Sequence, residues 1–415
     1  MSPNQSIEAA LNGIRVIDFS RIVAGPHSTM CLADFGADVI KVEDTGKGDD
    51  LRSQKPPHIK CDSPYFLSLN LNKRSISINM TEPDGQAVIH DLLATADVLV
   101  ENFRTGVMEK YGVGYEDIKA RYPRLVYCSI SGYGREGSQA RRAAYDPVVQ
   151  AESGQMATNG STVSGPMRTG LAVTDTQTGH YAVQAILAAL FARERSGRGQ
   201  YIEVPLFDVA VSTLSHYGIR FLMDGTELPR VGNGSNAAQP IGVFPAKDGK
   251  LIQVTCASER SFVQFAKALG REDLLEDPRF AANPQRLENR DALHEIFIEI
   301  LATDTRDSWI ERMHAEGAPV GPINEMGNAL THPFVVERGL VEHLPHPLVD
   351  TVPTIRSPIR MAETPVVPAM APPMLAQHSD EVLGDVLGYD AARIAELKDG
   401  GAVACRHGEA DARLS

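Results

Sequence analysis

The chain has 415 residues, of which 43% are hydrophobic and 22% are charged, as is usual for a globular protein with a large core. Its 40 Lys and Arg side chains against 53 Asp and Glu give a formal net charge of -13, which argues against a nucleic-acid partner. The five cysteines form no CxxC pair, so we predict neither a zinc site nor a disulfide framework. Scattered, unpaired cysteines of this kind fit a cytoplasmic location. The polar N-terminal 13 residues do not look like a signal peptide, and no long apolar run predicts a membrane span.

Apolar runs and helical patterns alternate through the first third of the chain. The apolar runs have the length of strands and occupy residues 14–20, 38–43, 74–80, 97–103 and 124–134. Helical patterns follow the first and third of them, around residues 24–37 and 84–95. Strands separated by helices of this length indicate βαβ units, so we predict an α/β fold with a parallel sheet covered by helices on both faces.

The composition changes near residue 225, after a long helix that follows Asp175 and a further strand and helix. A connector rich in Gly, Asn and Pro occupies residues 224–242, and a hairpin turning at Asp248-Gly249 follows it. Helical patterns then continue to about residue 316. We therefore predict a smaller α+β domain at 226–328, between a first part at 1–225 and a last part at 329–415.

Familiar nucleotide, hydrolase and metal motifs are missing. The turn after the first strand, FSRIVAGPHS, has one glycine where a dinucleotide site needs G-x-G-x-x-G, and neither a P-loop nor a G-x-S-x-G elbow occurs. The 12 histidines are scattered without an H-E-x-x-H motif, and His180 and His216 are more typical of helix packing or of the surface. The sequence thus predicts no metal site.

Two adjacent basic residues, Lys73 and Arg74, stand at the start of the third strand. Such pairs are usually solvated. Together with Arg104 and Lys110 they could instead surround a nucleotide phosphate.

Asp175 is the residue that the local pattern explains least, because it stands alone in TGLAVTDTQTGHYAV between small residues and a long helical pattern. One interpretation is a helix N-cap, which the spacing alone favours. The other is a nucleophile: Gly170 and Gly179 let a bulky ligand approach the backbone, and a carboxylate at the positive end of a helix stays ionised and can attack a carbonyl.

A set of longer motifs resembles the class III CoA-transferases, the family that includes formyl-CoA:oxalate and carnitine CoA-transferases. The motifs hold their order from about residue 11 to 398 and read LNGIRVIDFSRIVAGP, LADFGADVIKVE, NLNKRSISINM, ADVLVENFRTGVMEKYG, YDPVVQAESG, GLAVTDTQTGHYAVQAILAAL, SGRGQYIEVPLFDV and GAPVGPINEMGNALTHPFVVERGLV. The resemblance implies an enzyme that transfers CoA from an acyl-CoA, such as succinyl-CoA, to a small carboxylic acid. CoA is then a co-substrate, with no tightly bound cofactor.

The resemblance also implies a role for Asp175 as the nucleophile. Its carboxylate would form a mixed anhydride with the acyl group and then an aspartyl-CoA thioester, from which CoA passes to the acceptor. The implied CoA and substrate contacts are Val23, Ala24, Asn102, Phe103, Arg104, Lys110, Ala143, Ala144, Tyr145 and Asp146. Asp146 stands where formyl-CoA transferase has Glu. Val23 stands where oxalate-using members have Gln, and the glycine-rich lid of those members is reduced at 232–236; these two departures disfavour oxalate and formyl-CoA as substrates.

The implied fold is a Rossmann-like large domain, built from both ends of the chain, with the smaller domain inserted and two ring-shaped monomers interlocked as a homodimer. An α-methylacyl-CoA racemase is the enzymatic alternative, but SQARRAAYD lacks the histidine that such an enzyme needs before the segment at Tyr145. A second alternative is a non-catalytic CoA-binding protein. Such a protein would need no nucleophile, so the retained TDTQTG segment counts against it. Arg168 could pair with the distal carboxylate of a substrate or face solvent.

Overall fold

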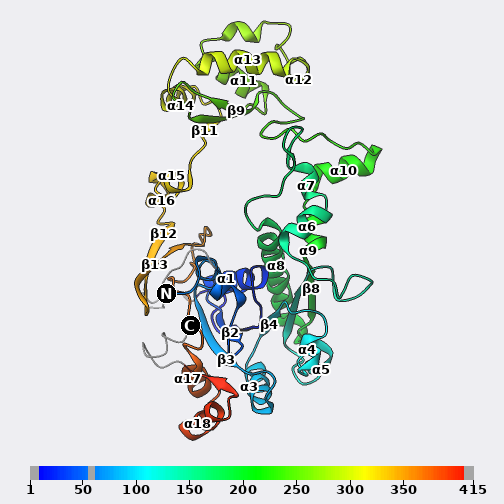
Figure 1. Cartoon of the computed structure of the whole chain (residues 1–415), viewed down its shortest axis with the longest axis vertical. Coiled ribbons are helices and arrows are strands. Elements are labelled where there is room, and N and C mark those ends of the chain that lie inside the picture. The colour runs from blue at the N-terminus through cyan, green and yellow to red at the C-terminus, as the bar shows by residue number, and fades with distance from the viewer. Residues whose placement is uncertain (1–8, 55–60, 406–415) are drawn as a thin grey trace. The chain divides into compact units, whose positions relative to one another are not determined.

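The computed structural model describes residues 9–54 and 61–405, and the chain divides into two compact units (Figure 1). The larger unit comprises Met1–Ser153, Gly170–Thr213 and Phe334–Ser415, and the smaller one comprises Gly154–Thr169 and Leu214–Pro333. The domain borders predicted at residues 225 and 328 stay predictions. The first eight residues, where we expect no signal peptide, lie outside the described part. Within the described ranges, no helix has the length and hydropathy needed to cross a bilayer.

The larger unit is built on a seven-stranded sheet with the order β14-β3-β2-β1-β4-β5-β8. Its strands are β1 Arg15–Asp18, β2 Asp38–Glu43, β3 Lys73–Ile78, β4 Val98–Glu101, β5 Val126–Ser131, β8 Tyr201–Pro205 and β14 Val403–Ala404. All neighbours are parallel except β14, which pairs antiparallel with β3. The predicted α/β fold with a parallel sheet is confirmed.

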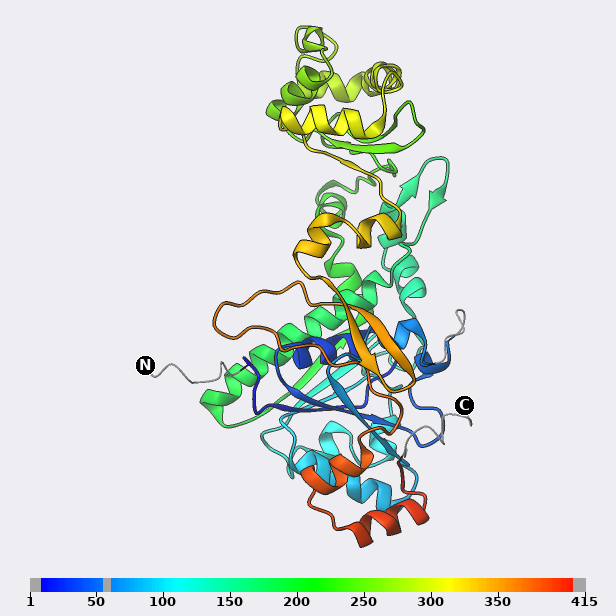
Figure 2. The ribbon, with the colours of Figure 1, turned by 90° about the vertical axis from the view of Figure 1, so that its left-hand side faces the viewer.

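Helices cover both faces of this sheet because successive side chains of each strand point to opposite sides. Val16 and Val98 pack with α1 (Ala24–Asp34) and α8 (Val173–Ser196) in one core. Ile17 and Leu99 pack with helices of the other face. These are α3 (Pro83–Ala94), α18 (Ala391–Asp399) and the π-helical η3 (Val382–Val386), and Figure 2 shows the red C-terminal helices beside the cyan ones.

Short elements complete the larger unit. They are η1 Asp50–Ser53, α2 Pro64–Leu67, α4 Val107–Lys110, α5 Tyr115–Ile118, α6 Asp146–Glu152, α9 Leu206–Ser212, α17 Ser379–Glu381 and the antiparallel pair β12 Val341–His346 and β13 Val349–Ile355. Helix α16, Pro333–Glu337, begins at the border of the two units.

The smaller unit has its own core. Its sheet has the order β11-β10-β9, and aromatic side chains such as Phe265, Phe297 and Trp309 fill the core between that sheet and its helices. The elements are β9 Ile241–Pro245, β10 Leu251–Thr255, β11 Val320–Pro322, α11 Glu259–Ala268, η2 Glu272–Leu275, α12 Asn283–Glu288, α13 Arg290–Leu301 and α14 Arg306–Ala315. Smaller pieces are α7 Gln155–Thr158, β6 Gly160–Ser161, β7 Gly165–Pro166, α10 Ser215–Asp224 and α15 Met326–Leu330. The hairpin predicted at Asp248-Gly249 is confirmed, with Gly249 in the left-handed region at φ 73°.

Candidate active site

A pocket of about 520 Å³ opens in the larger unit at the carboxyl ends of β1, β4 and β5. The strand order reverses between β1 and β4, and ligands of open parallel sheets bind at such a switch point. The lining comes from the segments that follow these strands, around Arg21–Ala24, 102–105 and 130–132, together with 140–145 and Asp175. The topology alone therefore makes this pocket the first candidate for a binding site.

The segment after β1 is held in a strained conformation. Ile22 has φ 66°, which is rare for a β-branched residue, and its N–H donates to Asp49 Oδ1 at 3.1 Å. The Asn102 side chain joins the segments after β1 and β4, because it accepts from Arg21 N at 2.8 Å and donates to Arg21 O at 2.7 Å. The side chains of Val23 and Ala24 are buried. Both residues nevertheless belong to the pocket lining, at the start of α1.

The basic side chains of the lining differ in whether they already bind other groups of the protein. Arg135 donates to Glu101 at 2.7 Å, to Ser129 Oγ at 2.7 Å and to the carbonyl of Phe103 at 2.6 Å, so it holds the protein's own loops. Arg142 is paired with Glu152. Arg104 and Arg141 are exposed and form no ion pair with any residue in the described ranges. They are the cations best placed for an anionic ligand.

The other predicted contacts fall in different places. Phe103, Ala143, Ala144 and Tyr145 are in the lining, and Tyr145 is 63% exposed. Lys110 is exposed on α4, outside the lining, with its ammonium 5.1 Å from the centre of the Tyr111 ring. Its phosphate contact stays a prediction.

Asp175 lies in the first turn of α8, and the carboxylate that caps this helix is Asp146. Helix α8 begins at Val173, so Asp175 is its third residue, and Ala172 occupies the cap position without a side-chain bond. Asp146 Oδ2 accepts from the N–H of Thr174 at 2.8 Å and of Asp175 at 3.2 Å. The prediction that Asp175 is the N-cap is wrong, because a residue 29 positions earlier supplies the acceptor through the tertiary fold.

The same arrangement sets the charge of Asp175. Burial, with the neighbouring charge of Asp146 second, raises the pKa of Asp175 to about 7. Near neutral pH this carboxyl is therefore about half ionised, whereas we expected the helix dipole to keep it ionised. Burial and then the two carboxylates also raise the pKa of the Tyr65 phenol, a neighbour that the sequence did not point to.

Asp146 itself is buried behind Asp175 and is not part of the lining. Its second oxygen, Oδ1, accepts from Gln150 Nε2 at 2.6 Å. With both oxygens engaged, Asp146 fixes the first turn of α8 and keeps a negative charge next to Asp175. Chemically, the site offers a carboxylate with a pKa close to neutrality, which is suited to attack on an activated carbonyl.

Lys73 and Arg74 do not belong to this site. Lys73 is buried, and its Nζ lies 3.1 Å from Asp18 Oδ2 and 2.9 Å from the carbonyl of Pro26. Arg74 pairs with Asp38 and Glu381. Solvation and phosphate contact are both wrong for Lys73, because its side chain enters the core beside β1. Arg74 is likewise engaged with the protein's own carboxylates.

Comparison with known proteins decides the family. The sequence model of CoA-transferase family III matches residues 11–379. The chain belongs to this family. The resemblance seen in the sequence is thus confirmed, and the protein is a CoA-transferase whose relatives act on CoA thioesters and carboxylates.

Two relatives and one solved structure illustrate the range of the family. Human succinyl-CoA:glutarate CoA-transferase is 38% identical over 393 residues, which is 95% of this chain and 90% of the relative. Formyl-CoA:oxalate CoA-transferase of Rhodopseudomonas palustris is 34% identical over 422 residues, 95% of this chain and 97% of that enzyme. A CAIB/BAIF family protein from Brucella suis has a TM-score of 0.84 with 35% identity, covering 91% of this chain and all of that one. These likenesses support both the fold and the class of reaction.

Proposed function

We propose that this family III CoA-transferase works through a covalent intermediate on Asp175. The observation that carries the proposal is the Asp175 carboxyl in the pocket lining, with its pKa raised to about 7 beside the anchored charge of Asp146. A carboxylate whose pKa is near the working pH is both substantially ionised and more nucleophilic than an ordinary Asp.

The steps follow from the chemistry of thioesters. The Asp175 carboxylate attacks the carbonyl of the acyl-CoA, the C–S bond breaks, and a mixed anhydride and CoA thiolate form. The thiolate attacks the aspartyl carbonyl, which gives aspartyl-CoA and releases the first acid as a carboxylate. The acceptor carboxylate then attacks the carbonyl of aspartyl-CoA, the C–S bond breaks, and a second mixed anhydride and CoA thiolate form. The thiolate attacks the acyl carbonyl of this anhydride, which gives the new acyl-CoA and releases the Asp175 carboxylate. Since both anhydrides join two carboxylic acids, they are close in energy, and the transfer stays reversible.

The pocket residues supply the binding that these steps require. Arg104 and Arg141 are free to pair with phosphates of CoA, and Val23 and Ala24 line the pocket at the start of α1. Asn102 keeps the segments after β1 and β4 together, so that they present one surface. We place Phe103 and the segment 143–145 against the remainder of CoA.

For substrates we propose succinyl-CoA as donor and a dicarboxylic acid of about four to six carbons as acceptor. The support is the human relative, whose name gives succinyl-CoA and glutarate, together with Val23 in place of the Gln of oxalate-using members and the reduced glycine-rich lid at 232–236. A panel of acyl-CoA donors against acceptor acids, read by mass spectrometry of the CoA esters, tests this choice. Transfer to oxalate faster than to any dicarboxylate of four to six carbons would contradict it.

Trapping the intermediate tests the mechanism directly. If CoA is held on Asp175 as a thioester, hydroxylamine converts that carbonyl to a hydroxamate and borohydride reduces it, whereas both spare a free carboxylate. We expect the mass change in the peptide 170–193, only when an acyl-CoA is present, and at Asp175. Asp146 is the control carboxylate because it lies beside Asp175 and is fully engaged in hydrogen bonds. Modification at Asp146 alone, or none during turnover, would exclude the proposed nucleophile.

The pKa of Asp175 predicts the pH dependence of transfer. Because only the carboxylate attacks, kcat/KM should rise about tenfold per pH unit below pH 7 and level off above about pH 8. Asp146→Asn removes the neighbouring charge but keeps an oxygen for the N–H of Thr174. We therefore expect kcat/KM of this variant to rise at lower pH than in wild type, although burial still holds the pKa of Asp175 above 3.8. If kcat/KM rises over the same pH range in Asp146→Asn and in wild type, the role of Asp146 is only to cap α8.

We also propose a cytoplasmic homodimer. In its support, α10 exposes large apolar side chains, with Leu222 80% and Met223 79% exposed, and such a face is suited to burial against another surface. Interlocking of two ring-shaped chains would bury it. A solution mass equal to one chain would exclude the dimer.

A further inference from the structure

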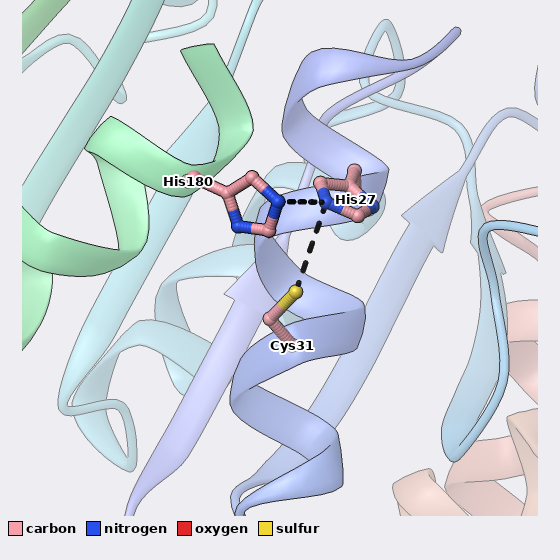
Figure 3. A group of neighbouring side chains, drawn as sticks. All are labelled: His27, Cys31 and His180. Carbon is pink, nitrogen blue, oxygen red and sulfur yellow. Dashed lines mark hydrogen bonds between the residues drawn. The ribbon is translucent and has the colours of Figure 1, made fainter. Parts of the chain in front are cut away.

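Three side chains with metal-binding atoms come together where α1 packs against α8. His27 and Cys31 extend from α1, and His180 extends from α8 (Figure 3). His27 Nε2 lies 3.4 Å from His180 Nε2 and 3.9 Å from Cys31 Sγ, and all three ligand atoms are within 4.8 Å of one another. Within the described ranges this is the only such group of three or more His, Cys, Asp and Glu residues.

The sequence explains why these side chains meet. His27 and Cys31 are four residues apart, so they share one face of α1. Gly179 precedes His180, and a Cβ atom at this glycine would lie 2.8 Å from the carbonyl oxygen of Ala24 and 2.9 Å from His27 Cδ2. Only glycine allows α1 and α8 to approach this closely. The pairing of the two helices, and not a chance surface rotamer, therefore brings His180 to His27.

The distances resemble the edges of a tetrahedral metal site. With Zn–N and Zn–S bonds of about 2.05 and 2.3 Å, a tetrahedral ion separates two nitrogens by about 3.3 Å and a nitrogen from a sulfur by about 3.6 Å. The observed 3.4 and 3.9 Å lie near these values. The third pair, His180 and Cys31, lies within 4.8 Å, so rotation of these side chains would bring all three atoms onto one ion.

We propose that His27, Cys31 and His180 form a binding site for a thiophilic divalent metal ion of the Zn²⁺ type. Two imidazoles and one thiolate are ligands that such ions prefer. His180 is exposed, so solvent can occupy the fourth position. The ion would link α1, whose start faces the pocket, to α8, which carries Asp175 five residues before His180. Its role would be to hold the two helices together, and no step of CoA transfer needs it.

The competing interpretation is a packed cluster joined by hydrogen bonds. One ring nitrogen would donate to the other at 3.4 Å, and the thiol would contact His27 at 3.9 Å. Burial, followed by the neighbouring His180, lowers the pKa of His27 to about 4, so this ring is neutral at pH 7. Burial, followed by Asp34, raises the pKa of Cys31 to about 12, so a bound metal must first displace the thiol proton. The two interpretations differ in whether metal binds, which is directly measurable.

Cobalt(II) is the suitable probe because a cysteine ligand gives it a thiolate-to-metal charge-transfer band. We expect tag-free, full-length protein to bind one Co²⁺, or one Zn²⁺ in competition with it, and to show this band together with a higher Tm. Cys31→Ser should abolish the band. Both Cys31→Ser and His180→Gln should weaken binding at least about 100-fold, since loss of groups that only support ligands already costs 10–100-fold.

Two matched variants complete the test. Cys61→Ser replaces a partly exposed thiol, and His216→Gln replaces an exposed imidazole on α10, so neither should alter metal binding. A Co²⁺ spectrum without a thiolate band, or equal affinity in Cys31→Ser and wild type, would overturn the proposal in favour of the hydrogen-bonded cluster. Either result would leave the proposed role of Asp175 untouched, because CoA transfer is measured separately.

Discussion

Asp175→Asn is expected to lower CoA transfer by at least about 10³-fold, because the amide cannot form the anhydride or the thioester. The change is nearly isosteric, so the pocket should still bind CoA. The measurement is the rate of new acyl-CoA formation, followed by chromatography, together with the Kd for CoA. A variant that keeps most of the wild-type rate would show that Asp175 is not the nucleophile.

Asp208→Asn is the matched control. Asp208 is the third residue of α9, as Asp175 is of α8, but it is exposed and outside the pocket lining. The two substitutions remove the same charge from the same position in a helix. Equal losses of activity in both variants would mean that the charge at a helix start matters and not the nucleophile.

Asp175→Asn should also change how the free energy of unfolding depends on pH. A carboxyl whose folded pKa is raised from 3.8 to about 7 contributes stability that is complete below pH 3.8 and is lost as the pH rises through 7. The full shift corresponds to about 4 kcal/mol, which access of solvent to the pocket reduces to about 2 kcal/mol. Asp175→Asn should therefore be as stable as wild type near pH 4 and more stable at pH 8, as measured by urea unfolding. Lower stability of the variant at both pH values would contradict the raised pKa.

Local pattern was sufficient to locate the first strands of the sheet and to draw attention to Asp175, although not to assign its role. Apolar runs such as 14–20 and 38–43 coincide with β1 and β2 because strands buried on both faces consist of consecutive apolar residues. Asp175 was conspicuous because a charged residue is unusual between small residues and a long helix. The order of the strands was not predicted, since it depends on which runs pair across more than 100 residues, as β3 and β14 do.

Contacts between distant residues account for what the sequence did not predict. The cap of α8 comes from Asp146, and the raised pKa of Asp175 follows from burial and, second, from that neighbour. The His27–His180 contact joins positions 153 apart, so no motif with short spacing could show it. Arg135 and Arg141 look alike in sequence, and only the structure shows that Arg135 is already bound to Glu101.

Lys73 is the clearest case of a local pattern that misleads, and it carries a large expected effect on stability. Its side chain is fully buried, and besides Asp18 and Pro26 it donates to Asn70 Oδ1 at 2.9 Å. Burial alone would raise the pKa of Asp18, but Lys73 and Lys41, with the hydroxyls of Ser20 and Thr29, lower it to about 2. Lys73 thus joins β3 to the end of β1 and to α1, and the pocket segment Arg21–Ala24 connects these last two elements.

Lys73→Met should lower the free energy of unfolding by about 3–5 kcal/mol, because it leaves Asp18 charged and buried without its closest cation. The measurement is urea unfolding at pH 7. Asp18→Asn combined with Lys73→Met removes both charges, so we expect part of the loss to be recovered. Lys119→Met is the control, since its partner Glu116 is 75% exposed and such surface pairs contribute at most about 1 kcal/mol. If Lys73→Met kept wild-type stability but bound CoA more weakly, Lys73 would be a phosphate ligand after all, and its place in the core would be refuted.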